Sequence, residues 1–510
     1  MPNDLGLSPA DVAHVHSHGL TTEAVHALVD KLRAPPRFVP IEKAATRGGG
    51  VVELADVEDL ADRFGGLATV PGKFTPMSGA ASRMFGFLER VATGTATPDD
   101  VDKTRRVAHA LDDRKGGPRL ALAAPLRVHL AGRGTELHAL LDGGDLAALA
   151  HHLLDDDGLG LRGKPKAVIP FHLRDGRPVT PLEEHMREAL AYAGGRLHAT
   201  ISPEHRPLYD LALDEIRTAD PSLRAVQVEF SVQHWATDSV AVDAETGALV
   251  RDEEGVPAFF PAGHGSLLRN IGDLGRPAVL RNVDNVPTRR SARRLVEVWH
   301  RGLAVLLSEI RGVMSEAMRV LDEGGGSADL LERCLTHLRR RGVNLLLDVA
   351  LYERATPQEK RAQLREALLR PIKVVGVVKN EGEPGGGPFV IPFAGHRIVS
   401  IVEKDEIAAD RRQMMRDGEF FNPVDILIDP TDHRGRPFDL TLFVNADRHF
   451  LVRKPYRGRD VVRLEHPGLW NGAMEGWTSL FVAMPLATFA PVKELVDLLR
   501  PEHQEDVSAS

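Results

Sequence analysis

The sequence predicts an α/β protein in which helices flank a mixed β-sheet. Short apolar runs such as "AVQVEFSVQ" and "IKVVGVVKN" alternate along the chain with longer amphipathic stretches, an order that is typical of α/β folds. Glycines and prolines cluster between the runs, as they do where strands end. Hydrophobic residues make up 43% and charged residues 27% of the chain, which is ordinary for a protein with a packed core.

The chain is longer than one hydrophobic core usually organises, because it has 510 residues. We expect an N-terminal helical extension over residues 1–68 and an α/β core over 69–405. Within that core, helical insertions are expected near 86–160 and 290–370. Residues 406–510 form a C-terminal segment and tail.

The elements are expected in the following order. Ser8 and Thr21 precede helical patterns that contain early acidic residues, so both are expected helix N-caps. Cys334 lies in a helical pattern as a structural thiol. The pattern favours strands within 68–79, 164–173, 197–203, 225–233, 278–286, 372–380 and 438–445, and a final helix over 491–499.

Charge and cysteine content exclude several classes of protein. The net charge is −8, whereas binding to nucleic acid or to an anionic membrane requires an excess of clustered Lys and Arg. The single cysteine excludes an internal disulfide framework. The sequence shows no signal peptide pattern and no apolar run long enough for a membrane span. We therefore expect a cytoplasmic protein that binds neither nucleic acid nor membrane.

A loop of small residues follows the first expected strand of the core. In "KFTPMSGAASRMFGFL", Ser78, Gly79 and Ser82 lie between an apolar run and a helical pattern, and Arg83 follows them. Small side chains let backbone N–H groups approach a phosphate, and a helix N-terminus and an arginine both favour the negative charge. The alternative is an ordinary turn between a strand and a helix.

Three further segments carry candidate polar groups. Lys166 follows a proline just before an apolar run, where it either contacts an anion or is simply solvated. Gly263, His264 and Gly265 offer bare backbone that can lie against a nucleobase. Asp284 ends an expected strand, where a carboxylate can hold Mg²⁺ or Mn²⁺ together with substrate phosphates. The alternative for the last two segments is a glycine turn with a capping aspartate.

The order of these segments resembles the uridylyltransferases, the UDP-sugar pyrophosphorylase group of nucleotidyltransferases. The resemblance implies the GT-A fold, a Rossmann-like mixed sheet flanked by helices. It also implies that Gly79 and Arg83 contact the triphosphate, that Lys166 contacts phosphate, that residues 263–265 lie at the base, and that Asp284 binds the metal.

The C-terminal half adds to this resemblance. "FNPVDIL" and "TFAPVKELVDLL" are similar to late motifs of the same enzymes, which places Asn422 near the sugar and Lys493 near the sugar phosphate. The loop "KNEGEPGGGPF" would line the sugar pocket, with Lys379, Glu381 and Gly386 as candidate contacts.

A closer match covers nearly the whole chain. From "KPKAVIPFH", "SVQHWATDSVAVD", "VVKNEGEPGGGPF", "LWNGAMEGW" and "PVKELVDLLRPEHQ", the chain is identified as a member of DUF4301, a bacterial family of unknown function. The family label implies no substrate.

The expected function is nucleotidyl transfer from a nucleoside triphosphate, preferably uridine, to a sugar 1-phosphate, with release of pyrophosphate. Two alternatives stay open. The first is a glycosyltransferase that uses a nucleotide sugar. The second is a non-catalytic nucleotide-binding protein, which is suggested by Ala80 and Ala81 where the enzymes carry glycines. The sequence does not predict which sugar is used or the oligomeric state.

Overall fold

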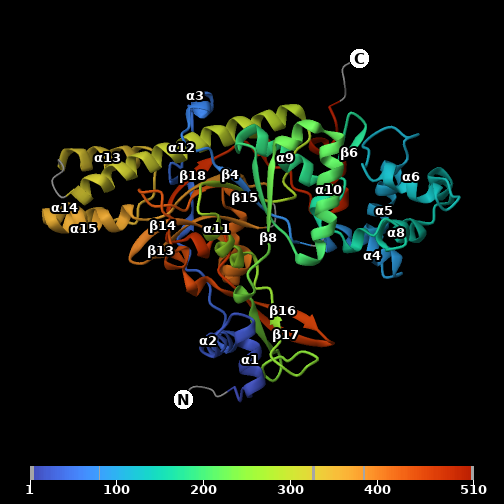
Figure 1. Cartoon of the computed structure of the whole chain (residues 1–510), viewed down its shortest axis with the longest axis horizontal. Helices are drawn as coiled ribbons and strands as arrows, with labels where there is room; N and C mark the ends of the chain where they lie inside the picture. The colour runs from blue at the N-terminus through green and yellow to red at the C-terminus, as the bar shows by residue number, and fades with distance from the viewer. Residues whose placement is uncertain (1–4, 80, 324–327, 383–384, 507–510) are drawn as a thin grey trace. The chain divides into compact units, whose positions relative to one another are not determined.

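The computed structural model describes residues 5–79, 81–323, 328–382 and 385–506 (Figure 1). The chain divides into two compact units, each assembled from three separate stretches. Unit 1 contains residues 1–55, 233–277 and 306–484, and unit 2 contains residues 56–232, 278–305 and 485–510. The zones expected from the sequence, 1–68, 69–405 and 406–510, stay a prediction.

Unit 1 contains three sheets of three or more strands. Their strand orders are β18-β12-β15, β1-β13-β14 and β10-β9-β17-β16. In the first sheet β12 is parallel to β18 and antiparallel to β15, so this sheet is mixed.

The helices of unit 1 are α1 (Pro9–Ser17), α2 (Thr22–Arg33), α11 (Leu268–Leu274), α13 (Ala328–Arg340), α14 (Val349–Arg354), α15 (Pro357–Leu368) and α16 (Arg412–Arg416). Its strands are β1 (Lys43–Ala44), β2 (Thr46–Arg47), β3 (Gly50–Val51), β9 (Ser239–Asp243), β10 (Phe259–Phe260), β12 (Ile372–Lys379), β13 (Gly386–Phe393), β14 (His396–Glu403), β15 (Phe420–Asp429), β16 (Phe450–Tyr456), β17 (Arg459–Glu465) and β18 (Thr478–Ala483).

The N-terminal helices of unit 1 pack on the sheet that contains β9 and β17 (Figure 1). Val15, Val25 and Val29 are fully buried against Val240 and Val242. Both helices begin where the sequence predicts, because the Ser8 and Thr21 side chains each accept a hydrogen bond from a backbone N–H three residues later. The two predicted N-caps are therefore confirmed, and the short strands β1 to β3 follow these helices.

Unit 2 contains a four-stranded parallel sheet in the order β11-β4-β7-β8. Lys73 of β4 bonds to Tyr192 of α9, and Tyr209 of α10 packs against Phe230 of β8, so both helices flank this sheet (Figure 1). The helices of unit 2 are α3 (Val57–Asp62), α4 (Ser82–Ala92), α5 (Pro98–Leu111), α6 (Ala123–Ala131), α7 (Leu137–Gly143), α8 (Leu146–Leu154), α9 (Pro181–Tyr192) and α10 (Arg206–Ala219), and α12 (Arg290–Glu323) begins in it. Its strands are β4 (Gly72–Pro76), β5 (His172–Arg174), β6 (Arg177–Val179), β7 (Arg196–Thr200), β8 (Gln227–Ser231) and β11 (Ala278–Arg281).

The insertion expected near 86–160 is helical, from the end of α4 through α8. Its buried face forms one apolar cluster with residues from elsewhere in unit 2, among them Val286 and Val492. These two valines lie two residues after Asp284 and directly before Lys493 in the chain. The insertion therefore packs under the two segments that carry those candidate residues.

The α/β fold class with a mixed sheet is confirmed, but three local predictions are wrong. Residues 164–173 form a 3₁₀ turn over Lys166–Val168 before the short β5, because Pro165 and Pro170 lack the N–H groups that a sheet needs. Residues 438–445 form a 3₁₀ turn, since the Asp439 side chain accepts a hydrogen bond from the backbone N–H of Thr441. The final helix is a 3₁₀ turn over Leu495–Leu499.

Candidate active site

The candidate site of unit 2 lies at the carboxyl ends of two neighbouring strands. Strands β4 and β11 are parallel, with Leu280 opposite Phe74. The loop that begins at Ser78 follows β4, and the turn that carries Asp284 follows β11. Both segments therefore leave the same edge of the sheet, which is where open α/β sheets bind their ligands.

Asp284 is buried and lies between two lysines. Lys166 Nζ donates to Asp284 Oδ2 at 2.9 Å, and Lys493 Nζ lies 3.2 Å from the same oxygen. Burial alone would raise the pKa of Asp284, but the charges of Lys493 and Lys166 outweigh it and lower this pKa below its usual value. The structure thus brings together three residues that the sequence predicts from separate segments.

Lys166 also connects the site to the C-terminal segment. Its Nζ donates to the Val492 carbonyl at 2.8 Å, and the backbone N–H of Val492 donates to the Asp284 carbonyl at 3.1 Å. The Lys166 side chain is only 13% exposed, whereas that of Lys493 is 52% exposed. Lys166 is therefore held in place, and Lys493 is the lysine that can swing toward a ligand.

Buried polar groups fix the turn that carries Asp284. Arg281 Nε donates to the Asn285 carbonyl at 2.8 Å, and its guanidinium also donates to the Thr488 carbonyl at 2.9 Å. His185 Nε2 bonds to the Val283 carbonyl at 3.0 Å. Asn285 Oδ1 in turn accepts from the backbone N–H of Ala490. The turn therefore has one conformation in which the Asp284 carboxylate faces the two lysines.

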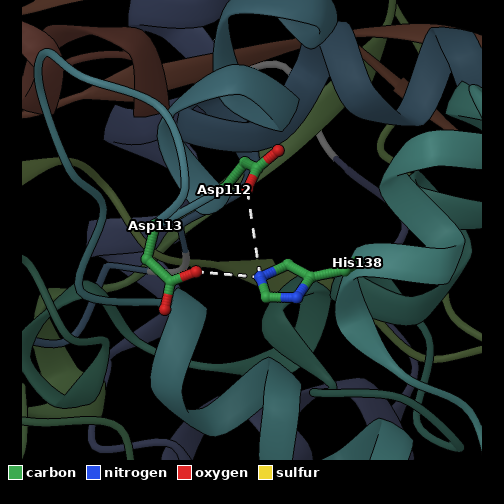
Figure 2. Close-up of side chains that lie close together, drawn as sticks. All are labelled: Asp112, Asp113 and His138. Carbon is green, nitrogen blue, oxygen red and sulfur yellow. Dashed lines mark hydrogen bonds and ion pairs between the residues drawn. The ribbon is translucent and has the colours of Figure 1, made fainter.

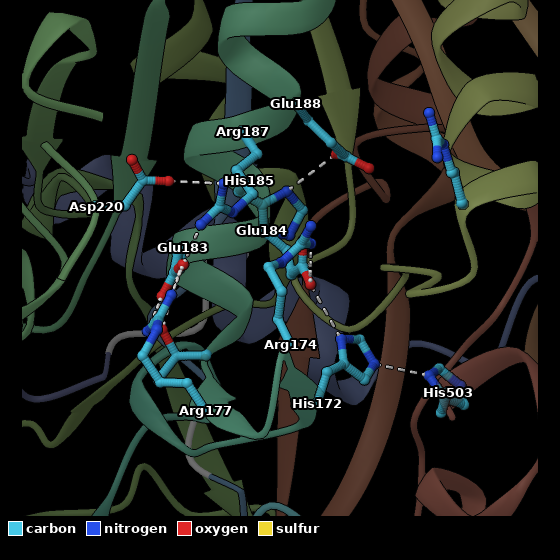
Figure 3. A network of polar contacts seen from close by, with 12 residues as sticks. His172, Arg174, Arg177, Glu183, Glu184, His185, Arg187, Glu188, Asp220 and His503 are labelled. Carbon is cyan, nitrogen blue, oxygen red and sulfur yellow. Dashed lines mark hydrogen bonds and ion pairs between the residues drawn. The ribbon is translucent and has the colours of Figure 1, made fainter. Parts of the chain in front are cut away.

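These groups belong to a larger polar network in unit 2 (Figure 3). Glu188 bonds to Lys73 and to Tyr192 at the sheet face of α9. His172 lies between Glu184 and His503, at 3.4 and 3.0 Å. None of these residues was predicted from the sequence, where the one signal was a charged residue inside an apolar run, the Arg281 of "AVLRN".

The loop after β4 is open on one side. A side chain at Gly79 would meet no atom within 4 Å, and Arg83 is exposed. Helix α4 begins at Ser82 without a side-chain cap, so its first N–H groups are available to an anion. Ala81 is fully buried in the apolar cluster, which directs its methyl group into the core, and Ala80 lies outside the described residues. The loop also meets the Lys166 segment, because the Ala81 backbone N–H donates to the Lys164 carbonyl.

In unit 1, Gly263, His264 and Gly265 pack against the chain that follows β17. A side chain at Gly265 would lie 2.2 Å from the Pro467 carbonyl oxygen, and one at Gly263 would lie 2.6 Å from the Glu465 carboxylate. His264 stacks on Trp470 with ring centres 4.7 Å apart, and its Nδ1 accepts from the Leu469 N–H. Close packing therefore explains the glycines, and contact with a base stays a prediction.

The remaining nitrogen of His264 connects this segment to the expected sugar loop. Nε2 lies 3.6 Å from Glu403, which pairs with Gly386 across β14 and β13. Burial would raise the pKa of Glu403, but His264 outweighs that effect and lowers it. Glu403 was not predicted from the sequence, although it ends the apolar strand β14.

The four residues predicted to contact the sugar lie in different surroundings. Lys379 and Glu381 are exposed and pair with each other at 3.3 Å. Asn422 is buried, and its Oδ1 accepts from the backbone N–H of Val424, which holds an unusual φ of 60° at a bulge of β15. Gly386 lines a cavity of about 260 Å³.

The structure offers two places to consider for a metal. Asp284 supplies one carboxylate, which fits Mg²⁺ only when phosphate oxygens complete the coordination. Asp112, Asp113 and His138 lie close together on the helical insertion (Figure 2). Arg114 holds Asp112, and Arg127 holds Asp113 at 2.6 Å. Since both carboxylates are neutralised, this cluster is an ion-pair network.

No helix among the described residues combines the length and apolar character needed to cross a bilayer.

Comparison with solved structures finds many similar chains at low identity, among them the following three. UDP-glucose phosphorylase from Trypanosoma brucei is 12% identical, with a TM-score of 0.45 over 96% of this chain and 77% of the other. A mutant UDP-glucose pyrophosphorylase from Leishmania major is 12% identical, with a TM-score of 0.41 over 97% and 79%. The uridine diphosphate N-acetylglucosamine pyrophosphorylase from Trypanosoma brucei is 14% identical, with a TM-score of 0.36 over 96% and 80%. No curated protein matches the sequence. The family model of a domain of unknown function, DUF4301, matches residues 8–504, and the chain belongs to that family.

Proposed function

We propose that the protein is a metal-dependent nucleotidyltransferase that forms a nucleotide sugar and pyrophosphate from a nucleoside triphosphate and a sugar 1-phosphate. The observation that carries this proposal is the position of Asp284 between Lys166 and Lys493, at the sheet edge where the loop after β4 also emerges. The proposal also rests on the order of these motifs along the sequence.

The reaction needs charge neutralisation more than covalent chemistry. An oxygen of the sugar phosphate attacks the α-phosphorus, the bond to the bridging oxygen breaks, and pyrophosphate leaves from the opposite side. After donating to Asp284 and to Val492, Lys166 keeps one N–H without an acceptor among the described residues, and we assign this N–H to the charge on the transferred phosphate. Arg83 and the N-terminus of α4 hold the leaving phosphates, and Lys493 holds the sugar phosphate. A bound Mg²⁺ would neutralise further phosphate charge beside Asp284.

The remaining candidate residues are assigned from their sequence motifs alone. His264 and its flanking glycines are assigned to the base, with a preference for uridine, and Gly386 and Asn422 are assigned to the sugar side. The direct link between His264 and Glu403 supports grouping the two segments.

The test is pyrophosphate release with Mg²⁺, with four nucleoside triphosphates against a panel of sugar 1-phosphates. Asp284→Asn and Lys166→Gln should each lower turnover by roughly 10²- to 10³-fold. Lys115→Gln, a surface lysine of the same unit, is the matched control and should leave turnover unchanged. Release that is equal in all four proteins would contradict the assignment of Asp284 and Lys166.

One observation favours a second candidate, a non-catalytic nucleotide-binding protein. Both lysines already neutralise Asp284, so a metal must displace at least one of them. If so, a uridine nucleotide raises the melting temperature while no sugar phosphate gives pyrophosphate.

A further inference from the structure

The helical insertion of unit 2 holds the segment that carries Lys493. Helix α5 packs against the 3₁₀ turn over Leu495–Leu499. Val492, directly before Lys493, is fully buried in the apolar cluster of the insertion. At the far end of the segment, the Gln504 side chain accepts from the Arg119 N–H at 2.7 Å and donates to the Arg119 carbonyl at 3.1 Å. The insertion therefore contacts this segment on both sides of Lys493.

One side chain of the insertion reaches the residue next to Lys493. Lys103 Nζ of α5 lies 2.9 Å from Glu494 Oε2, and it also pairs with Asp99, one turn earlier on the same helix, at 3.0 Å. The contact with Glu494 raises the pKa of Lys103, because the carboxylate stabilises the charged ammonium. Within the described part of the chain, Lys103 is the one cation that pairs with Glu494.

The backbone of Lys493 is fixed, whereas its side chain is exposed. The N–H groups of Lys493 and Glu494 both donate to Asp497 Oδ2, at 2.8 Å each. Asp497 is buried, and its other oxygen pairs with Arg500 at 2.9 Å. A long side chain reaches a ligand in one geometry only if the backbone from which it extends is held. Glu494 and Asp497 provide that support for Lys493.

We propose that the helical insertion positions Lys493 for the sugar phosphate, and that Lys103 is the positioning residue, acting through Glu494. The inference rests on the proposed function, because that function assigns the sugar phosphate to Lys493. Lys103 itself does not contact substrate in this account. Lys493 holds the sugar phosphate both before and during the reaction, so loss of its position should raise KM for the sugar phosphate more than it lowers kcat.

The first measurement is the steady-state rate of pyrophosphate release by the full chain with Mg²⁺ and UTP. Glucose 1-phosphate and N-acetylglucosamine 1-phosphate are the varied substrates. Lys103→Gln should raise KM for the sugar phosphate by about 3- to 10-fold. It should leave KM for UTP unchanged and shift the melting temperature by less than about 2 °C. Lys103→Arg, which keeps the cation, should restore most of the parental KM.

A double variant and a control test whether Lys103 acts through Glu494. Glu494→Gln should raise KM for the sugar phosphate as Lys103→Gln does. The double variant should be no worse than either single variant, because both substitutions break the same contact. Asp99→Asn is the matched control, since it removes the other ion pair of Lys103 and leaves the contact with Glu494. Its KM should equal that of the parent.

The second measurement is hydrogen exchange followed by mass spectrometry, which requires no turnover. The amides of Lys493 and Glu494 are protected by their bonds to Asp497. Lys103→Gln should accelerate exchange in a peptide that covers residues 488–499 by about 3- to 10-fold. Asp99→Asn should leave this exchange unchanged.

Three results would overturn the inference: unchanged exchange of residues 488–499 in Lys103→Gln, an equal rise in KM for UTP and for the sugar phosphate, or additive effects in the double variant. If the parent releases no pyrophosphate, the proposed function fails, and the exchange measurement still decides whether Lys103 orders the Lys493 segment. If the parent turns over and Lys103→Gln has the parental KM, the positioning role fails and the reaction stands.

Discussion

Replacement of Gly265 by alanine tests whether packing fixes the Gly-His-Gly segment. The new Cβ would lie 2.2 Å from the Pro467 carbonyl oxygen and 3.1 Å from the His466 side chain, whereas ordinary contact begins at 3.4 Å. One of the two backbones must therefore move by about 1 Å, in a place where Gly265 is buried. Overpacking of this kind costs about 1–3 kcal/mol. At about 2–4 °C per kcal/mol for a unit of this size, we expect the melting temperature to fall by about 2–12 °C.

The assay is thermal unfolding followed by circular dichroism, with Gly272→Ala as the matched control. Gly272 lies in α11, where the nearest atom to a new Cβ is 3.9 Å away. Alanine is favoured over glycine inside a helix by about 0.5–1 kcal/mol, so this control should be at least as stable as the parent. If Gly265→Ala melts at the same temperature as the control, the argument that close packing requires this glycine is wrong.

Three other substitutions test the buried polar groups of the two units. Arg448→Met leaves the buried carboxylates of Glu406 and Glu475 without their guanidinium and should cost about 3–5 kcal/mol in urea unfolding; a loss below about 1 kcal/mol would contradict this. Asn422→Ala removes the acceptor that holds the β15 bulge and should cost about 1–2 kcal/mol, whereas Asn422→Asp, which keeps an oxygen acceptor, should cost less. Burial and the neighbouring His172 lower the pKa of His503 to about 3, from 6.5. The unfolded state therefore binds more protons than the folded state below pH 6.5. The free energy of unfolding should fall as the pH drops below 6.5, with a slope of up to ~1.4 kcal/mol per pH unit. His503→Gln should remove that part of the slope in melts from pH 7 to 5, and an unchanged slope would show that His503 is not buried as a neutral imidazole.

Hydrophobic pattern and cap residues were enough to predict part of the fold. The strands β4, β8, β11 and β12 lie inside the predicted apolar runs, and β7 begins one residue before its run, because apolar runs between turn signals depend on local sequence. The predicted strands at 164–173 and 438–445 were wrong, since prolines and an aspartate cap override the apolar pattern. Each unit is assembled from three separate stretches of the chain. This division was not predicted, because it depends on contacts between residues that are distant in the sequence.

The sequence predicted three charged residues of the candidate site, but not the buried polar residues that hold them in position. Lys166, Asp284 and Lys493 came from separate motifs. The structure places the Nζ atoms of both lysines within 3.2 Å of Asp284 Oδ2. Arg281, His185 and Glu188 were not predicted, because a charged residue in sequence usually lies at the surface. Here they are stabilised by one another and by backbone carbonyls, which only the folded chain brings near.

Because unit 2 is assembled from three separate stretches of the chain, the ribosome synthesises its parts at different times. Asp284 and Lys166 are translated early, but Lys493 and Val492, which complete their hydrogen bonds, follow only after the long third stretch of unit 1. At about 5–20 residues per second, the ribosome takes roughly 10–40 s to pass from the end of the second stretch of unit 2 to Lys493. During that time the Asp284 turn also lacks the Ala490 and Thr488 contacts. A nascent chain can therefore complete unit 1 before it can assemble the lysine pair, and any ligand that needs both lysines binds only after that point.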